Sequence, residues 1–311
     1  MGRKTLNRQV RYALLQKLKI GESRHEAKKQ LQAELGKDYH FGMTTEGIHS
    51  YETYKTYHKA CDRFARWCIE KQGVNKYSKP EDAKGLVIPY MQYRKDSGLS
   101  VSTLKTERAA LGKLYGEPVN FPLPKRTPEN ITRSRNPVEM DKHFSEENNK
   151  DLITIAQGTG CRRDDEAKSR VGDFVEINGR LHVKILKSKG GRNRVAPILP
   201  GMEKDVMKIV ETARTEGRER LFDHIHTKMD VHSYRRQYAQ ELYKTISKDR
   251  KLRDELLKAY PPRREPNIKG STYTTRRKDI PNKTFLRDDL YLVSQALGHN
   301  RLDVTVTHYL T

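Results

Sequence analysis

The sequence predicts a multidomain protein that is mainly helical and carries a small antiparallel sheet in its C-terminal half. Apolar residues recur at helical spacing over residues 48–117, a proline-rich basic stretch follows, and short strand-like runs then alternate with turn signals. Proline-rich segments between helical blocks are typical of interdomain linkers. With 311 residues the chain is long enough for two or three domains. We therefore expect an N-terminal segment at 1–44, a helical domain at 45–119, a linker at 120–140 and a second domain at 141–311.

The helical domain is predicted from the spacing of its apolar residues. The first helix has an apolar face and an opposite basic face. A weaker helix, or a pair of helices, covers Pro80–Arg94, and another helix begins near Ser102. The apolar face of the first helix holds Tyr54, Tyr57, Cys61, Phe64, Ala65 and Cys68. The outward basic residues are Lys55, Lys59, Arg63 and Arg66 on the first helix, and Lys105, Arg108 and Lys113 on the last. Of these, Lys55, Lys59, Arg63, Lys105 and Arg108 are predicted to bind DNA.

Two short helices are expected in the N-terminal segment. Val10 and Leu14 have the spacing of an apolar helix face. Ser23 and Glu26 then form the S-x-x-E pattern that starts a second helix, and Gly36 ends it.

The second domain combines helices with a hairpin-rich sheet. Asn178-Gly179 between two apolar runs is a strong signal for a two-residue hairpin turn. An insertion is expected at about 244–288, and within it residues 261–284 are predicted to form a loop or a β-hairpin. Expected helices lie at about 146–158 and from Arg162 to about Val171, and expected strands at 174–177, 181–186 and 194–199.

Composition restricts the classes of partner. The chain has 62 Lys and Arg against 40 Asp and Glu, which gives a formal net charge of +22. A polyanion explains this excess best, because each cation that neutralises a phosphate releases counterions. The longest apolar runs are only a few residues, and no signal-peptide pattern begins the chain. Three cysteines make no disulfide framework, which fits a cytoplasmic protein.

Six polar residues of the second domain occur in an order that carries chemistry. Each would more often be structural than functional if it stood alone, so the prediction depends on the set. Arg162 follows Thr159-Gly160 at a helix start, Lys189 lies in a hairpin turn, His232 and Arg235 form an H-x-x-R pair, His299 follows a Leu-Gly pair, and Tyr309 comes ten residues later.

These residue types suit phosphodiester exchange without a metal. Negative charge builds on the non-bridging oxygens of a pentacoordinate phosphorus, so the reaction requires fixed positive charge there. Two guanidinium groups can hold those oxygens by bidentate hydrogen bonds, and Arg162 and Arg235 are the candidates. His232 can act as acid or base near neutral pH, and Tyr309 supplies a phenol nucleophile. No metal or other cofactor is expected, because His224 and its histidine neighbours have no Cys or carboxylate at ligand spacing.

The set resembles the tyrosine recombinase (phage integrase) family, whose motifs run T-G-x-R, a hairpin lysine, H-x-x-R, L-G-H and a tyrosine nine or ten residues later. The resemblance covers about residues 45–311 and implies a SAM-like core-binding domain followed by a mixed α+β catalytic domain. It implies that Lys189 is the general acid for the leaving 5′ oxygen, that His299 donates a hydrogen bond to the phosphate, and that Asp165 supports the site. Arg163 is an alternative for the first arginine, but the T-G-x-R spacing favours Arg162.

The implied activity is site-specific recombination of double-stranded DNA through a 3′-phosphotyrosine and a Holliday junction. Four protomers would act on two sites, without metal or ATP, to integrate or excise a mobile element. A directionality factor would be a further partner, and a bacterial or phage-encoded, nucleoid-associated protein is expected. Two alternatives stay open: a type IB topoisomerase that relaxes supercoils as a monomer, and a DNA-binding accessory protein without the chemistry.

Three features depart from the family pattern or leave alternatives open. The insertion holds Arg263, Arg264, Arg276 and Arg277, which predicts contacts to DNA, although a tolerated surface insertion is the alternative. Only two residues follow Tyr309, where the family has a further segment, so either the chain is truncated or protomers contact each other elsewhere. The segment at 1–44 is either an arm that binds DNA by itself or an extension of the helical domain.

Overall fold

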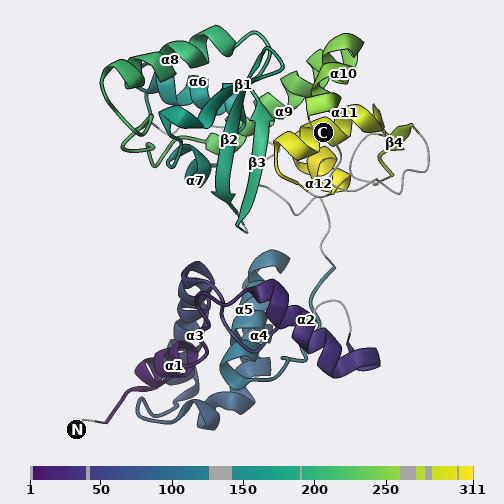
Figure 1. Cartoon of the computed structure of the whole chain (residues 1–311). Helices are drawn as coiled ribbons and strands as arrows, with labels where there is room; N and C mark the ends of the chain where they lie inside the picture. The colour runs from purple at the N-terminus through teal and green to yellow at the C-terminus, as the bar shows by residue number, and fades with distance from the viewer. Residues whose placement is uncertain are drawn as a thin grey trace. The chain divides into compact units, whose positions relative to one another are not determined.

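The structure is a computed structural model, and the residues that it describes fall into two compact units (Figure 1). The units are Met1–Ile131 and Thr132–Thr311. The described residues are 3–39, 43–125, 142–189, 191–259, 271–276, 282–299 and 301–310. Most of the expected linker at 120–140 therefore lies outside them.

The N-terminal unit consists of helices packed around one apolar core. A serine side chain caps the first turn of α3 and of α5, because Ser50 accepts from the N–H of Thr53 and Ser100 from that of Thr103. The expected pair of helices after α3 is a 3-10 helix at Pro80–Leu86 followed by α4. The bounds are α1 Leu6–Leu15, α2 Arg24–Leu35, α3 Tyr51–Gln72, α4 Val87–Asp96 and α5 Val101–Tyr115.

Helix α1 is part of this core, whereas α2 is not. Leu6, Val10 and Leu14 are at most 1% exposed and belong to the same cluster as Phe64 of α3. No residue of α2 is buried, and Figure 1 shows this helix extending from the side of the unit. The first part of the N-terminal segment is thus an extension of the helical unit.

The C-terminal unit is mainly helical with two small antiparallel sheets, as the sequence predicts for this fold class. Strands β1, β2 and β3 form one sheet in that order, and β4 pairs with β5 in the other. The helices are α6 Lys150–Thr159, α7 Arg163–Glu166, α8 Glu203–Thr215, α9 Val231–Lys248, α10 Arg250–Ala259, α11 Arg287–Ala296 and α12 Leu302–Thr305. The strands are β1 Phe174–Ile177, β2 Arg180–Ser188, β3 Arg192–Pro197, β4 Thr272–Thr274 and β5 Thr284–Leu286.

The predicted hairpin turn forms, but the predicted helix from Arg162 to Val171 is wrong. Asn178 and Gly179 have φ angles of 51° and 75°, the left-handed pair that a tight hairpin requires. Helix α7 ends at Glu166, because the chain then turns and the N–H of Val171 donates to the carbonyl of Glu219 (3.0 Å). Pairing with the segment after α8 therefore replaces the last turns of the expected helix.

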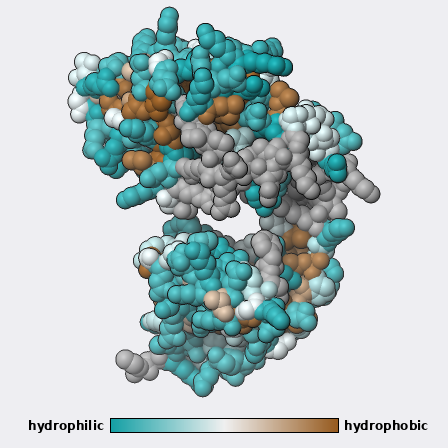
Figure 2. All heavy atoms as spheres, turned by 45° about the vertical axis from the view of Figure 1, so that its right-hand side comes forward, coloured by the Kyte–Doolittle hydropathy of each residue, from teal (hydrophilic) through white to brown (hydrophobic). Residues whose placement is uncertain are grey.

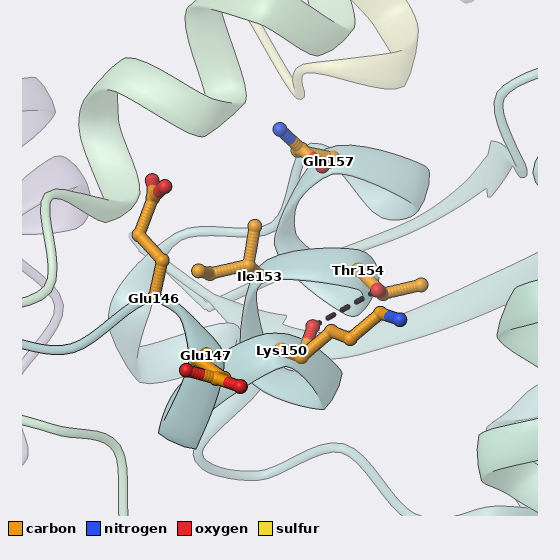
Figure 3. A pocket seen from close by; sticks show the side chains of 6 residues that line it. All are labelled: Glu146, Glu147, Lys150, Ile153, Thr154 and Gln157. Atoms are coloured by element: carbon orange, nitrogen blue, oxygen red, sulfur yellow. Dashed lines mark hydrogen bonds between the residues drawn. The ribbon is translucent and has the colours of Figure 1, made fainter.

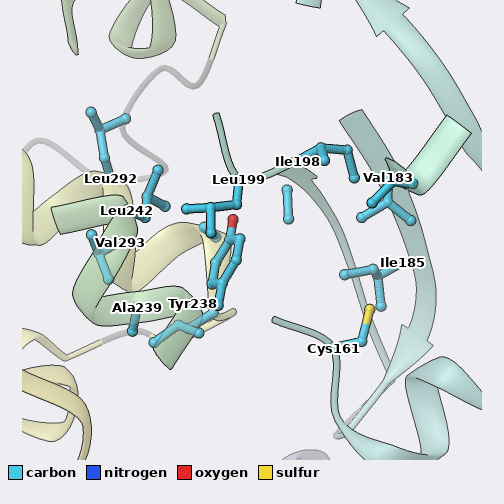
Figure 4. Packing of buried hydrophobic residues seen from close by; sticks show 14 of the residues in the cluster. Cys161, Val183, Ile185, Ile198, Leu199, Tyr238, Ala239, Leu242, Leu292 and Val293 are labelled. Atoms are coloured by element: carbon cyan, nitrogen blue, oxygen red, sulfur yellow. The ribbon is translucent and has the colours of Figure 1, made fainter. Parts of the chain in front are cut away.

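Tyr238 is a residue of α9, and its side chain packs in the C-terminal core near Leu199 (Figure 4). Its side chain is fully buried, and its hydroxyl donates to the carbonyl of Pro197 (2.7 Å). The ring also explains why residue 160 is a glycine. A Cβ at Gly160 would lie 2.3 Å from Tyr238 Cδ1, and the φ angle there is +59°, which favours glycine. Close packing of glycine against tyrosine thereby fixes the turn that leads into Arg162.

Leu14→Ala is expected to destabilise the protein by about 3 kcal/mol, because it leaves a cavity where α1 packs on α3. The matched variant Leu31→Ala, on α2, is expected to cost less than about 1 kcal/mol. Urea unfolding of both variants measures the difference. Equal, small effects would contradict the assignment of α1 to the core.

Candidate active site

Tyr309 lies at the end of the chain in a π-helical turn, Val306–Leu310, and its side chain faces three of the predicted site residues. Nε of Arg235 donates to the Tyr309 hydroxyl (3.3 Å), and the guanidinium carbon is 5.5 Å from the ring centroid. The rings of His232 and His299 lie 5.3 and 5.1 Å from it, centroid to centroid. Tyr309 is only 5% exposed, and the side chains around its ring include two imidazoles and a guanidinium.

Arg235 is a buried cation that no carboxylate neutralises within the described part of the chain. It is 1% exposed, and its guanidinium donates to the carbonyls of Gly160 and Leu297. Burial lowers its pKa, but a guanidinium stays protonated at physiological pH. Carbonyl dipoles and the Tyr309 hydroxyl are therefore its partners, and the site retains an excess of positive charge.

Arg162 reaches the same carbonyl from the start of α7. Its Nη2 donates to the carbonyl of Leu297 (3.2 Å) and its Nη1 to the Ser188 hydroxyl (3.1 Å). The side chain is 26% exposed, so one side remains open to solvent. Burial lowers its pKa to about 10, and the charges of Arg235 and Arg194 add to this effect. Two guanidiniums thus converge on one carbonyl oxygen beside Tyr309.

His299 is held as a neutral base. Burial, followed by the charges of Arg235 and Arg162, lowers its pKa to about 3. Its Nε2 lies 3.5 Å from Nη2 of Arg235, and its Nδ1 lies 3.0 Å from the Thr305 hydroxyl. Because a guanidinium only donates, Nε2 is the acceptor, and we assign the ring proton to Nδ1.

His232 lies on the first turn of α9, three residues before Arg235 and hence on the same helix face. Asp230 caps this turn by accepting from the N–H of Ser233 (3.0 Å). Partial burial of the ring, and then the charge of Arg235, lower the pKa of His232. The lowered pKa favours the neutral imidazole, and the residue is exposed.

Asp165 and Arg194 form an ion pair beneath Arg162. Nη2 of Arg194 lies 2.9 Å from Oδ2 of Asp165, and that oxygen also accepts from the backbone N–H of Arg162 (3.2 Å). Burial raises the pKa of Asp165, but the Arg194 charge and the hydrogen bonds outweigh it, so the pKa is lowered. Sequence reasoning missed Arg194. Its position two residues before the buried Ala196 on β3 was the available signal, because alternation points both inward.

Lys189 is the predicted site residue without a direct contact to the others in the described part of the chain. It is exposed in the turn that follows β2, and none of the described site residues forms a hydrogen bond or ion pair with it. The structure thus brings together Arg162, His232, Arg235, His299 and Tyr309, and leaves Lys189 at the tip of a hairpin.

The chain matches no protein-family model and no curated protein, but it is similar to solved structures over most of its length. The XerH site-specific recombinase bound to a palindromic difH substrate is 16% identical, with 97% of this chain and 90% of that chain covered and a TM-score of 0.48. The Tn1549 transposon integrase with transposon right end DNA is 10% identical, with 93% and 95% covered and a TM-score of 0.41. The XerA recombinase is 15% identical, with 92% and 94% covered and a TM-score of 0.30.

The residues predicted to bind DNA differ in exposure and in whether an ion pair within the protein already engages their charge. Lys59, Lys105 and Arg276 are exposed, as is Lys55, which pairs with Glu52 at 2.7 Å. Hydrophilic residues also cover most of the surface seen in Figure 2. Arg263, Arg264 and Arg277 lie outside the described residues.

Two of these predicted DNA-binding arginines instead make contacts within the N-terminal unit. Nη2 of Arg63 lies 2.9 Å from the buried Glu107, and Nη1 of Arg108 donates to the carbonyl of Phe121 (2.9 Å). Arg94 also pairs with Glu107 at 2.9 Å, so this carboxylate holds two guanidiniums. Structural contacts therefore account for at least part of the role of Arg63 and Arg108.

Two surface hollows lie among residues other than the cluster around Tyr309. One is lined by residues of α6 and of the segment just before it, among them Glu146, Lys150 and Gln157 (Figure 3). Another lies in the N-terminal unit and includes Arg24, His49 and Lys113. The predicted outward position of Lys113 is wrong, because the residue is buried and its ammonium donates to backbone carbonyls at Thr45 and Glu46. Among the described residues there is no group of side chains suited to hold a metal ion, and no helix long and apolar enough to span a membrane.

The lowered pKa of His299 predicts how stability depends on pH. The unfolded chain takes up a proton near pH 6.5 and the folded chain only near pH 3, so this group's contribution to stability is present above pH 6.5 and is lost as the pH falls. His299→Gln should therefore lose less free energy of unfolding between pH 7 and pH 4 than the wild type. Urea titrations at both pH values test this, with His25→Gln on the exposed face of α2 as the matched control. Identical losses in the wild type and His299→Gln would contradict it.

Proposed function

We propose that the protein is a tyrosine-type site-specific DNA recombinase that cleaves and rejoins strands through a phosphodiester bond to Tyr309. The observation that carries the proposal is the contact of the Tyr309 hydroxyl with Arg235, whose guanidinium shares a carbonyl with that of Arg162. Two fixed guanidiniums next to a phenol are what an in-line attack on a phosphodiester requires. The order of the six residues along the sequence adds independent support.

In the proposed cleavage step, the phenol oxygen of Tyr309 attacks the phosphorus and the bond from phosphorus to the 5′ oxygen breaks. The phenol proton passes to His232, because the lowered pKa of this imidazole favours its neutral form, which can accept a proton. Lys189 gives a proton to the departing 5′ oxygen. Arg162 and Arg235 stabilise the charge on the non-bridging oxygens. One phosphodiester replaces another, so the energy for rejoining is conserved and ATP is not consumed.

Duplex DNA is the proposed partner, because the net charge is +22 and exposed lysines such as Lys59 and Lys105 lie on helices of the N-terminal unit. Four protomers on two sites, a Holliday junction and a mobile element as the biological setting complete the proposal. A type IB topoisomerase would share the cleavage chemistry. It would relax a supercoiled plasmid without joining two sites, so paired relaxation and two-site recombination assays separate the functions.

Tyr309→Phe should form no covalent DNA adduct while retaining DNA affinity within about threefold, because it loses only the nucleophile. The probe is a library of nicked duplexes with randomised arms, in which the short 5′-hydroxyl fragment diffuses away after cleavage and traps the adduct. SDS gels of labelled DNA measure it. Tyr51→Phe, exposed at the start of α3, is the matched control and should retain the adduct. Absence of an adduct with the wild-type protein would overturn the proposed chemistry and favour the accessory-protein alternative.

DNA affinity should fall steeply with salt. If the protein neutralises six or more phosphates, the association constant is expected to drop by about 10³ between 50 and 200 mM salt. Fluorescence anisotropy with a labelled duplex from the same library measures the slope. A slope close to zero would contradict binding dominated by phosphate contacts.

A further inference from the structure

A buried hydroxyl joins the hairpin tip to the arginines of the candidate active site. Ser188 is the last residue of β2, directly before Lys189, and is 3% exposed. Its Oγ accepts from Nη1 of Arg162 (3.1 Å) and from Nη1 of Arg194 (2.8 Å). A hydroxyl has two acceptor positions, so guanidinium groups take both of those of Ser188.

We infer that Ser188, held by Arg194, is a positioning residue that fixes where Lys189 lies relative to Arg162. This inference rests on the proposed function. Lys189 itself has no described contact with the site. Its neighbour in sequence, however, is bonded to the side chain that would hold the phosphate. The position of the proton donor is thus coupled to that of the phosphate through one side chain.

The strand ladder alone does not fix this end of the hairpin. The register between β2 and β3 shifts between Ile185 and Ser188, and the intervening Lys187 has a φ of 49°, which is unusual for a residue other than glycine. The ladder resumes at Ser188, which pairs with Arg192 and accepts the N–H of Gly191 (2.8 Å). Ser188 is therefore the point at which the tip is tied back to the body of the domain.

Arg194 extends the connection to the segment that carries His299. Its Nε donates to the carbonyl of Ala296 at the end of α11 (3.1 Å), and its side chain is 4% exposed. Gly298 leaves room for it, because a Cβ at that residue would lie 3.0 Å from Arg194 Cδ. One guanidinium thus contacts α7, the hairpin and the turn before His299, so Ser188 is anchored on a rigid support.

The test compares two leaving groups. The substrate is one nicked duplex from the library that the wild-type protein cleaves. It is made in two versions, one with the natural bridging 5′ oxygen at the cleavage site and one with sulfur in its place. A thiolate leaves without being protonated, whereas the 5′ oxygen needs the proton of Lys189. Ser188→Ala should form the adduct at least about tenfold more slowly than wild type on the oxygen substrate, since a general acid contributes about 10²–10⁴-fold. On the sulfur substrate its rate should return to within about threefold of wild type, as should that of Lys189→Ala.

Two further variants separate positioning from loss of structure. Arg162→Ala should stay slow on both substrates, because the phosphate still needs its clamp. Thr212→Ala, which removes a hydroxyl from the exposed face of α8, should match wild type on both. Ser188→Cys retains the side-chain volume and should show the same dependence on the leaving group if Ser188→Ala does not fold.

Equal slowing of the Ser188 variants on oxygen and sulfur substrates, or no slowing on either, would overturn the inference while leaving the proposed function intact. A wild-type protein that forms no adduct with either substrate would instead overturn the proposed function, and the inference with it.

Discussion

The charge of Arg235 is the constraint on which the rest of the C-terminal unit depends. An arginine cannot escape burial by losing its proton, and its desolvation costs several kcal/mol unless other groups compensate. Here the compensation comes from two backbone carbonyls and a phenol, with no carboxylate in the described part of the chain. The neighbouring ion pair of Asp165 and Arg194 leaves Arg162 only a longer contact of 3.8 Å with the same carboxylate. Such an arrangement is unfavourable for folding and favourable for an anion, because the positive charge is already in place before the ligand arrives.

Backbone carbonyls, more than side-chain ion pairs, surround the charge of Arg235. The carbonyls that Arg235 contacts belong to Gly160 and Leu297, which lie at turns after α6 and at the end of α11. Tyr238 presses against Gly160, which only a glycine permits, and so fixes one of these turns. The other turn is held by Arg194 through Ala296. Burial, and then the charge of Arg235, lower the pKa of both histidines, so the neutral imidazoles next to Tyr309 are favoured.

Sequence patterns predicted the mainly helical fold, the hairpin turn at Asn178-Gly179 and the grouping of Arg162, Arg235, His299 and Tyr309, because periodicity and turn chemistry are local and the motifs occur in a fixed order. They did not predict the early end of α7, which depends on pairing with a segment about 50 residues away, nor the inward position of Arg194. Spacing placed Arg63 on an outer face, where its side chain is 42% exposed, but did not predict that Glu107, 44 residues later, pairs with it. Such errors share a cause: an arginine that bonds within the protein and one that awaits a ligand look alike in sequence. The roles of the site residues remain predictions.

The most direct test of the central claim identifies the residue that carries DNA after cleavage. The wild-type protein is trapped on a nicked duplex, digested with nuclease and protease, and the nucleotide-bearing peptide is sequenced by tandem mass spectrometry. The account predicts a single modified peptide with the nucleotide joined through its 3′ phosphate to Tyr309. A nucleotide on any other residue, or joined through a 5′ phosphate, would contradict it.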